Sequence, residues 1–267
     1  MSQHRARRAA VIVLAVALSV LASCGSEPKT PADPANSSGA ASTGTQQSDA
    51  LPPASEVRAY FAAVASYDPA QLRAAQASTE DGSVAANYVG YLLELSRAAV
   101  ASGSPEAGAK IEPAGADAYT ACRADGRTND CVVWSDFTGR DGKLVDFTVN
   151  GETLDSRISA GDGTTVPAGS IGDVQVAYAY QSVQSQDLYV VVKVAAAEGV
   201  TIVSDQATYQ SDGSQVSASS FVGPTGGVGG RTTTVVLVFP QAAVGGTVTL
   251  TLIGRDQATE SVELTTS

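Results

Sequence analysis

The sequence predicts an α+β region of three helices and a curved antiparallel sheet over residues 55–155, followed by an all-β sandwich over residues 165–267. Three observations favour this class. Apolar residues first recur at helical spacing, the period then changes to the two-residue alternation of strands, and finally short β-branched runs are separated by Gly, Pro, Asp and Ser.

Three helices are expected before residue 105. The first covers about 55–67, with Ser55 as its cap. The second begins after Asp68, a capping residue followed by Pro69, whose missing N–H costs nothing in a first turn. The third and longest is opened by Ser83, and Gly103 ends it.

Alternation predicts strands at 116–122, 131–138 and 144–150. Asp141-Gly142 lies between the last two and is typical of a two-residue hairpin, because both residues accept positive φ. Pairing Arg140 with Lys143 then sets Trp134 opposite Val149 and Asp136 opposite Phe147. Asp136 becomes the one carboxylate on an apolar face.

This order of elements, together with the hairpin at 136–144, resembles the nuclear-transport-factor-2-like α+β cone over residues 55–155. The resemblance implies a pocket in which desolvation raises the pKa of Asp136 and makes it a general base. Ketosteroid isomerases of this fold similarly use acids and tyrosine. The alternatives are that Asp136 lies in water or the register differs, and that the aromatic residues form an ordinary core. The pocket hypothesis names Asp136, Trp134, Tyr60, Tyr88, Tyr91 and Tyr119.

The region after residue 165 resembles the small immunoglobulin-like domains of secreted lipoproteins from high-GC Gram-positive bacteria. Its longest strands are expected at 174–182, 188–194, 232–239 and 247–253, with an unbroken apolar run at 235–239 that indicates a central strand. The Cys…Trp…Cys pattern of antibody domains is missing, so the likeness is one of architecture.

The first residues have the composition of an export signal. Three arginines precede an apolar run at 9–20, which is shorter than the roughly 20 residues needed to cross a bilayer. Leu21-Ala22-Ser23-Cys24 resembles a bacterial lipobox, which implies cleavage of residues 1–23 and a diacylglycerol on Cys24. Residues 24–54, rich in Ser, Pro, Ala and Gly, are expected to form a disordered tether.

The composition excludes several classes of partner, catalytic mechanism and metal site. The net charge is −11, and −14 once the three leader arginines are removed, which argues against nucleic acid or anionic lipid as a direct partner. The single histidine is His4, in the leader, so catalytic mechanisms and zinc sites that need histidine are excluded from the mature chain. The acidic loop at 125–130 has its oxygens at the wrong offsets for calcium. We therefore expect no metal and no cofactor.

Two cysteines remain after the one assigned to lipid. Cys122 and Cys131 are expected to form a disulfide in an oxidising compartment, because further ligands for a metal are absent and the spacing differs from the C-x-x-C redox motif.

These observations together predict a lipoprotein anchored on the extracytoplasmic face of the cell membrane. Its expected role is a non-enzymatic binding or interaction module, with an envelope protein or cell-wall component as partner. The alternative is a small-molecule or isomerase-like pocket within residues 55–155.

Overall fold

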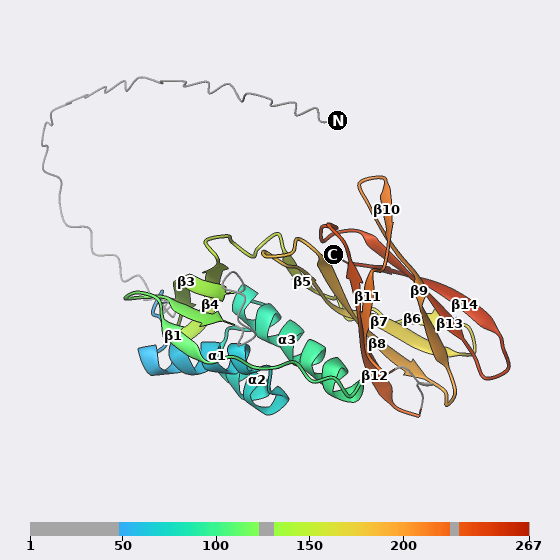
Figure 1. Ribbon diagram of the computed structural model, residues 1–267, viewed down its shortest axis with the longest axis horizontal. Helices are drawn as coiled ribbons and strands as arrows, with labels where there is room; N and C mark the ends of the chain where they lie inside the picture. Colours follow the sequence, from blue (N-terminus) through green and yellow to red (C-terminus); the bar gives the residue numbers. More distant parts are fainter. Residues whose placement is uncertain (1–47, 123–130, 225–229, 267) are drawn as a thin grey trace, which may run out of the picture. The chain divides into compact units, whose positions relative to one another are not determined.

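The computed structural model describes residues 48–122, 131–224 and 230–266, which belong to one compact unit. The expected signal peptide, Cys24, most of the tether and the loop at 125–130 lie outside these residues. Within the described part, no helix is long and apolar enough to cross a membrane. Three helices and antiparallel sheets form an α+β region followed by a β-sandwich (Figure 1).

Local capping chemistry sets the helix boundaries. α1 (Ala54–Ser66) begins after Pro53, so the expectation that Ser55 caps it is wrong. α2 (Pro69–Ala75) is capped by Asp68, whose Oδ1 accepts from the backbone N–H groups of Ala70 and Gln71, both at 2.9 Å. A 3₁₀ turn, η1 (Gln76–Ser78), follows α2. α3 (Val84–Ala101) is capped by Ser83, as expected.

The first sheet has the order β1-β2-β3-β4, with all pairs antiparallel. β3 and β4 are joined at Asp141 and Gly142, which both have positive φ, and Arg140 pairs with Lys143 as expected. The strands are β1 (Ile111–Pro113), β2 (Tyr119–Cys122), β3 (Cys131–Arg140) and β4 (Lys143–Val149).

Two sheets form the sandwich, with the orders β11-β12-β8-β7-β5 and β10-β9-β13-β14; β6 also pairs with β7. One sheet of the sandwich contains β5 (Ile158–Ala160), β6 (Val166–Ala168), β7 (Gly172–Gln181), β8 (Leu188–Ala196), β11 (Ser220–Val222) and β12 (Thr232–Phe239). The second contains β9 (Thr201–Ser211), β10 (Ser214–Ser217), β13 (Thr247–Ile253) and β14 (Thr259–Thr265).

The sheet that contains β7, β8 and β12 is covered on both faces. Val235 and Leu237 pack into the sandwich core, whereas Val236, between them, packs against the helices. Alternate residues of a strand point to opposite faces, so the unbroken apolar run at 235–239 serves two cores at once. Its prediction as a central strand is confirmed, since β12 lies between β11 and β8.

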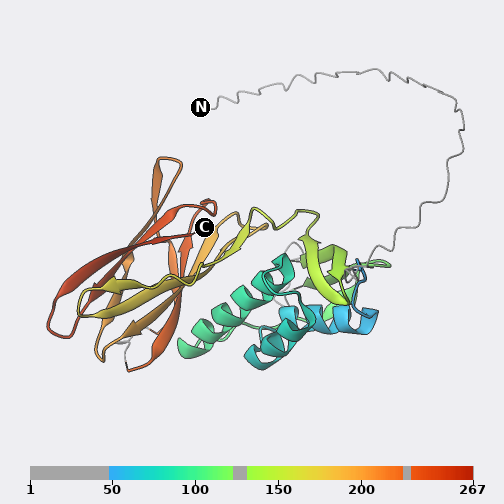
Figure 2. The same cartoon turned by 180° about the vertical axis from the view of Figure 1, so that it is seen from behind.

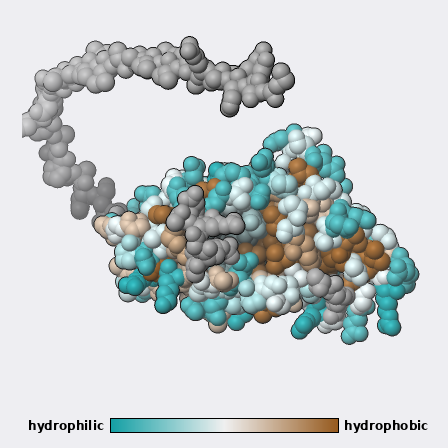
Figure 3. All heavy atoms as spheres, in the orientation of Figure 1, coloured by the Kyte–Doolittle hydropathy of each residue, from teal (hydrophilic) through white to brown (hydrophobic). Residues whose placement is uncertain are grey.

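α3 supplies the cover for this sheet. Figures 1 and 2 show the helix between the first sheet and the sandwich, in contact with β7, β8 and β12. From Tyr88 to Leu95 every residue of α3 is buried, because the helix faces the first sheet on one side and the sandwich on the other. On the face drawn in Figure 3, hydrophilic residues predominate at the outer edge, and hydrophobic residues gather in patches over the sandwich.

The first described residues, from Ser48 onward, lie against the β3–β4 hairpin. The N–H groups of Asp141 and Gly142 donate to the carbonyls of Ser48 and Ala50, at 2.8 and 3.0 Å. A Cβ at Gly139 would lie 2.6 Å from the Cα of Leu51, so this close approach of two backbones requires glycine.

Candidate functional site

A cavity lies at the disulfide end of the β1–β4 sheet. It has a volume of about 530 Å³ and will be called the aromatic cavity. A smaller cavity of about 190 Å³ adjoins it, since the two share Tyr67, Tyr88, Val132 and Gln184. The aromatic cavity is lined by Val64, Ala65, Tyr67, Tyr88, Ala107, Ala109, Ala121, Cys131, Val132, Trp134, Asn150, Gln184 and Ser185.

Tyrosines from both regions of the fold converge beside the cavity. Tyr88 and Tyr91 lie three residues apart on α3 and therefore share a face. Tyr180 of β7 contacts both rings, with centroids 5.5 and 4.8 Å away, and pairs in register with Tyr189 of β8. Tyr67 ends α1 with a φ of 51°, and its carbonyl accepts from the Ser96 hydroxyl.

The hydroxyls of Tyr88, Tyr91 and Tyr180 stay protonated over the physiological range. Burial raises the pKa of Tyr88 and of Tyr91 well above 10, and neighbouring tyrosines add to this shift. Burial also raises the pKa of Tyr180 to about 12. The cavity therefore offers neutral hydroxyl groups that can donate or accept hydrogen bonds.

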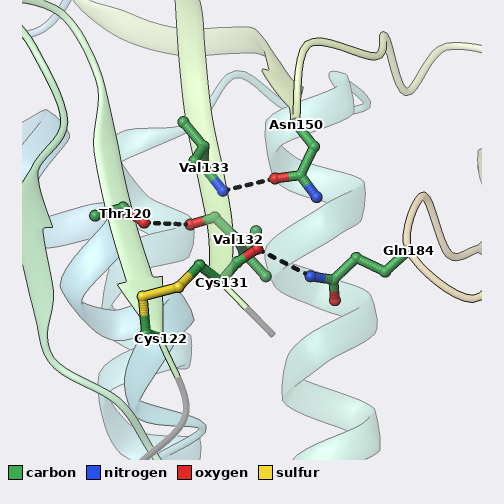
Figure 4. Close-up of a disulfide and its surroundings, with 7 residues drawn as sticks. All are labelled: Thr120, Cys122, Cys131, Val132, Val133, Asn150 and Gln184. Atoms are coloured by element: carbon green, nitrogen blue, oxygen red, sulfur yellow. Dashed lines mark hydrogen bonds between the residues drawn. A yellow bond between two sulfur atoms is a disulfide. The ribbon is translucent and has the colours of Figure 1, made fainter. Parts of the chain in front are cut away.

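The expected disulfide between Cys122 and Cys131 is confirmed, and Cys131 lines the cavity (Figure 4). The bridge joins residues that face each other across β2 and β3. Gln184, in the loop between β7 and β8, donates from Nε2 to the Cys131 carbonyl at 3.1 Å. This bond connects the β7–β8 loop of the sandwich to the edge of the cavity.

Asn150 forms another part of the rim. Its Oδ1 accepts from the backbone N–H of Val133 at 2.8 Å, and its own N–H donates to the Val133 carbonyl at 2.8 Å (Figure 4 shows the side-chain bond). Among the described residues no bond uses Nδ2, so Asn150 can provide a donor at the rim just as Gln184 Oε1 can provide an acceptor.

Trp134 is the tryptophan in the wall of the cavity. It pairs with Val149, as expected, and only 3% of its surface is exposed. Its buried Nε1 group has no hydrogen-bond partner among the described residues. The nearby Trp134 N–H opposes only a small part of the rise in the Tyr88 pKa that burial causes. Trp134 and Tyr88 are therefore two expected pocket residues that the fold brings together.

Asp136 lies outside both cavities and is exposed to solvent, which is the alternative that the sequence left open. The register between β3 and β4 shifts after Ser135, and Asp136 has a φ of 54°, so the expected pairing with Phe147 is not made. The carboxylate is exposed. Hydrogen bonds from the hydroxyls of Thr148, at 2.7 Å, and Ser135, at 3.0 Å, hold its pKa below the usual value. The bulge turns the side chain out of the apolar face, where desolvation would have raised the pKa.

The other predicted tyrosines divide between core and cavity. Tyr91 lines the smaller cavity. Tyr60 is buried and donates to the Ala85 carbonyl at 2.8 Å, so its hydroxyl fixes α1 to α3. Tyr119 is half-buried and stacks on Phe137 with a centroid distance of 5.9 Å. Neither Tyr60 nor Tyr119 lines the aromatic cavity.

Sequence reasoning missed the residues that complete the site. Tyr67, Asn150 and Gln184 occupy chain turns, where no periodic pattern marks them. Tyr180 and Tyr189 belong to strands that were expected, but their packing on α3 was not. Glu106, half-buried after the helix, brings a carboxylate to the smaller cavity. The one available signal was the pairing of Tyr180 and Tyr189 in adjacent strands.

Comparison of the chain with protein-family models, curated proteins and solved structures finds no match.

Proposed function

We propose that the chain is a lipoprotein, anchored through Cys24 on the extracytoplasmic face of the membrane, whose folded unit is a non-enzymatic binding module with the aromatic cavity as its ligand site. The observation that carries the binding role is the cavity itself. Its volume of about 530 Å³ lies within the usual range of small-molecule sites, roughly 300–1,000 Å³.

The lining favours an uncharged ligand with a ring or another flat apolar part. All described residues that line the aromatic cavity are uncharged. An ionised ligand would lose hydration there without gaining a counter-ion, whereas aromatic walls favour flat apolar groups. Tyrosine hydroxyls and the carboxamides of Asn150 and Gln184 supply the hydrogen bonds that orient such a ligand.

The proposal includes a fold assignment finer than α+β followed by a sandwich. We assign residues 55–155 to the nuclear-transport-factor-2-like cones and residues 165–267 to the immunoglobulin-like sandwiches. Support comes from three helices preceding a four-stranded sheet with a bulged β3, and from two stacked antiparallel sheets. In this assignment an envelope protein or cell-wall component is the partner of the sandwich.

Isomerase-like chemistry is the alternative function. It needs a general base beside the ligand, and Asp136 is too exposed and too acidic for that role. Glu106 is the carboxyl group that lines the smaller cavity among the described residues. A Glu106→Gln variant that binds ligand unchanged supports the binding role, and loss of a measured turnover in that variant would support the enzyme.

Trp134 makes the binding role directly measurable. It is the single tryptophan of the chain and lies in the cavity wall, so tryptophan fluorescence, excited where tyrosine absorbs little, reports on this site. We expect the neutral dye N-phenyl-1-naphthylamine to quench Trp134 in a saturable way, and a panel of uncharged ring compounds to compete with it.

A matched pair of variants locates the binding. Ala107→Phe places a ring in the cavity mouth and is expected to weaken binding of the dye at least tenfold, a loss of about 1.4 kcal/mol. Ala114→Phe adds the same ring at an exposed position outside the lining and should leave binding unchanged. Equal affinity in both variants, or no saturable quenching in the parent, contradicts a ligand site here.

The anchor has its own test. Cells that express the full chain are grown with labelled fatty acid. We expect the label on the parent chain and none on Cys24→Ser, together with release of the variant from the membrane fraction. Label on neither chain rejects the anchor without affecting the cavity.

A further inference from the structure

A second pocket, of about 560 Å³, lies where the C-terminal half of α3 meets β8 and β12 (Figures 1 and 2 show this end of the helix). It will be called the cationic pocket. Its lining consists of Glu94, Arg97, Ala101, Lys193, Pro224, Arg231, Thr232, Thr233 and Thr234. No residue of the aromatic cavity is among them.

The charge of this pocket opposes that of the chain. The whole sequence carries −11, with 16 basic and 27 acidic residues. The described lining nevertheless combines three cations with one carboxylate, a net of +2. Cations gathered in a concave site focus a positive potential there, even in a protein that is acidic as a whole.

Glu94 serves to hold the cations in place. Its side chain is 7% exposed; Oε1 lies 2.7 Å from Arg97 Nη1 and 3.2 Å from Lys193 Nζ, and Oε2 accepts from the Thr234 hydroxyl at 3.1 Å. Both of its oxygens are therefore occupied. Arg97 and Lys193 keep further N–H groups, and their side chains stay more than one-third exposed.

Arg231 completes the set from the start of β12. It is exposed, and no carboxylate among the described residues lies within ion-pair distance of it. The adjacent Thr232 and Thr233 add hydroxyl donors. Guanidinium, ammonium and hydroxyl groups around one space are the donors that recognise phosphate oxygens.

The end of α3 does not cancel this charge. Ala101, its last residue, lines the pocket, and a helix C-terminus carries about −0.5 of an elementary charge. The carbonyls of Ala98, Ala99 and Val100 are also occupied by donors from residues 102–104. A positive excess therefore remains at the pocket.

We propose that the cationic pocket binds the phosphate group of a phosphorylated small molecule or of a lipid headgroup. Arg97, Lys193 and Arg231 contact the phosphate oxygens, and Glu94 is a positioning residue that keeps two of these cations on the pocket side of the sheet. The volume exceeds that of a bare phosphate ion, which leaves room for the group esterified to it.

The test uses the full chain purified in detergent and ³¹P NMR titrations with inorganic phosphate and with glycerol 3-phosphate. Arg231→Glu is expected to weaken binding at least tenfold, because it replaces a donor with a like charge. Arg73→Ala, which removes an exposed cation on α2, should leave binding unchanged. Glu198→Gln should strengthen it slightly, since the Glu198 side chain lies beside Gly230.

Binding to vesicles distinguishes a phosphorylated small molecule from a lipid headgroup as the ligand. Phosphatidylglycerol vesicles are compared with phosphatidylcholine vesicles, using the parent and Arg231→Glu. Binding of the soluble phosphates that Arg231→Glu abolishes identifies a small molecule, and an Arg231-dependent preference for phosphatidylglycerol alone identifies a headgroup. Absence of both effects, or equal behaviour of parent and variant, overturns the proposal. Trp134 fluorescence should not respond to phosphate, which keeps this outcome independent of the aromatic cavity.

Discussion

The two halves of α3 meet the same sheet with different chemistry. Tyr88 and Tyr91 pack on the ring of Tyr180, whereas Glu94 reaches Lys193 and Thr234. The change occurs along β8, where Tyr189, Val191 and Lys193 follow one another on the face toward the helix. One interface therefore ends in an uncharged cavity at one side and a cationic pocket at the other.

The two ends of α3 should therefore differ in how much they contribute to the stability of the fold. Aromatic burial is non-directional and scales with the area removed from water, so the tyrosine end should contribute most of the packing energy. A buried carboxylate gains little net energy because it must first be desolvated, but it fixes the direction of its cations. The charged end should therefore matter less for stability.

Tyr180→Ala tests the aromatic end and should have the largest effect. Removing a buried aromatic side chain costs about 3–5 kcal/mol in the free energy of unfolding. Denaturant unfolding measures it. Tyr180→Phe keeps the ring and should cost under about 1.5 kcal/mol. A loss in Tyr180→Ala below that of Glu94→Gln reverses the proposed ranking.

Alkaline pH should weaken the same end. Because the folded-state pKa of Tyr180 is about 12 against 10.0 for an unperturbed tyrosine, the folded form retains its proton where the unfolded form has lost it. Its contribution is complete below pH 10 and is lost as pH rises to 12, about 3 kcal/mol in all. Unfolding measured over this pH range should show the loss, and Tyr180→Phe should show less of it.

Glu94→Gln tests the charged end and should cost about 2 kcal/mol, the value of hydrogen bonds to a charged group. The larger penalties of broken buried ion pairs do not apply, because Lys193 and Arg97 are 35% and 37% exposed. Glu198→Gln, at an exposed carboxylate, is the matched control and should change the unfolding free energy by less than about 0.5 kcal/mol.

Gly90→Ala has the smallest expected effect but an informative sign. Alanine ordinarily stabilises a helix interior by about 1 kcal/mol relative to glycine. Here the new Cβ would lie 2.3 Å from Tyr178 Oη and 2.6 Å from its Cζ, so the ring must move. We expect a net destabilisation of about 1 kcal/mol. In a Tyr178→Ala background the substitution should become stabilising, and stabilisation in the parent contradicts the close packing.

Features set by neighbouring residues were predictable from the sequence. Asp68 caps α2, Ser83 caps α3 and Asp141-Gly142 forms the hairpin, because each depends on side chains within a few residues. The disulfide followed from elimination among three cysteines. The strand pattern located the main strands of the sandwich for the same reason.

Features set by tertiary contacts were not predictable. The bulge at Asp136 leaves the local alternation of residue types unchanged, so only the pairing with β4 reveals it. β5 and β6 are three-residue strands that exist through pairing with β7. The aromatic cavity joins Tyr67 to Gln184, and no local pattern connects residues so far apart in the chain.

The hydrogen bonds that Ser48 and Ala50 accept from the β3–β4 hairpin attach the preceding residues to the folded unit at this hairpin. Any pull transmitted from the residues before Ser48 reaches the hairpin first, through the two backbone contacts at Asp141 and Gly142. Cys131 begins β3 and Arg140 ends it, about 30 Å apart at 3.3 Å per residue. The aromatic cavity, which Cys131 lines, therefore lies at the other end of β3 from this contact.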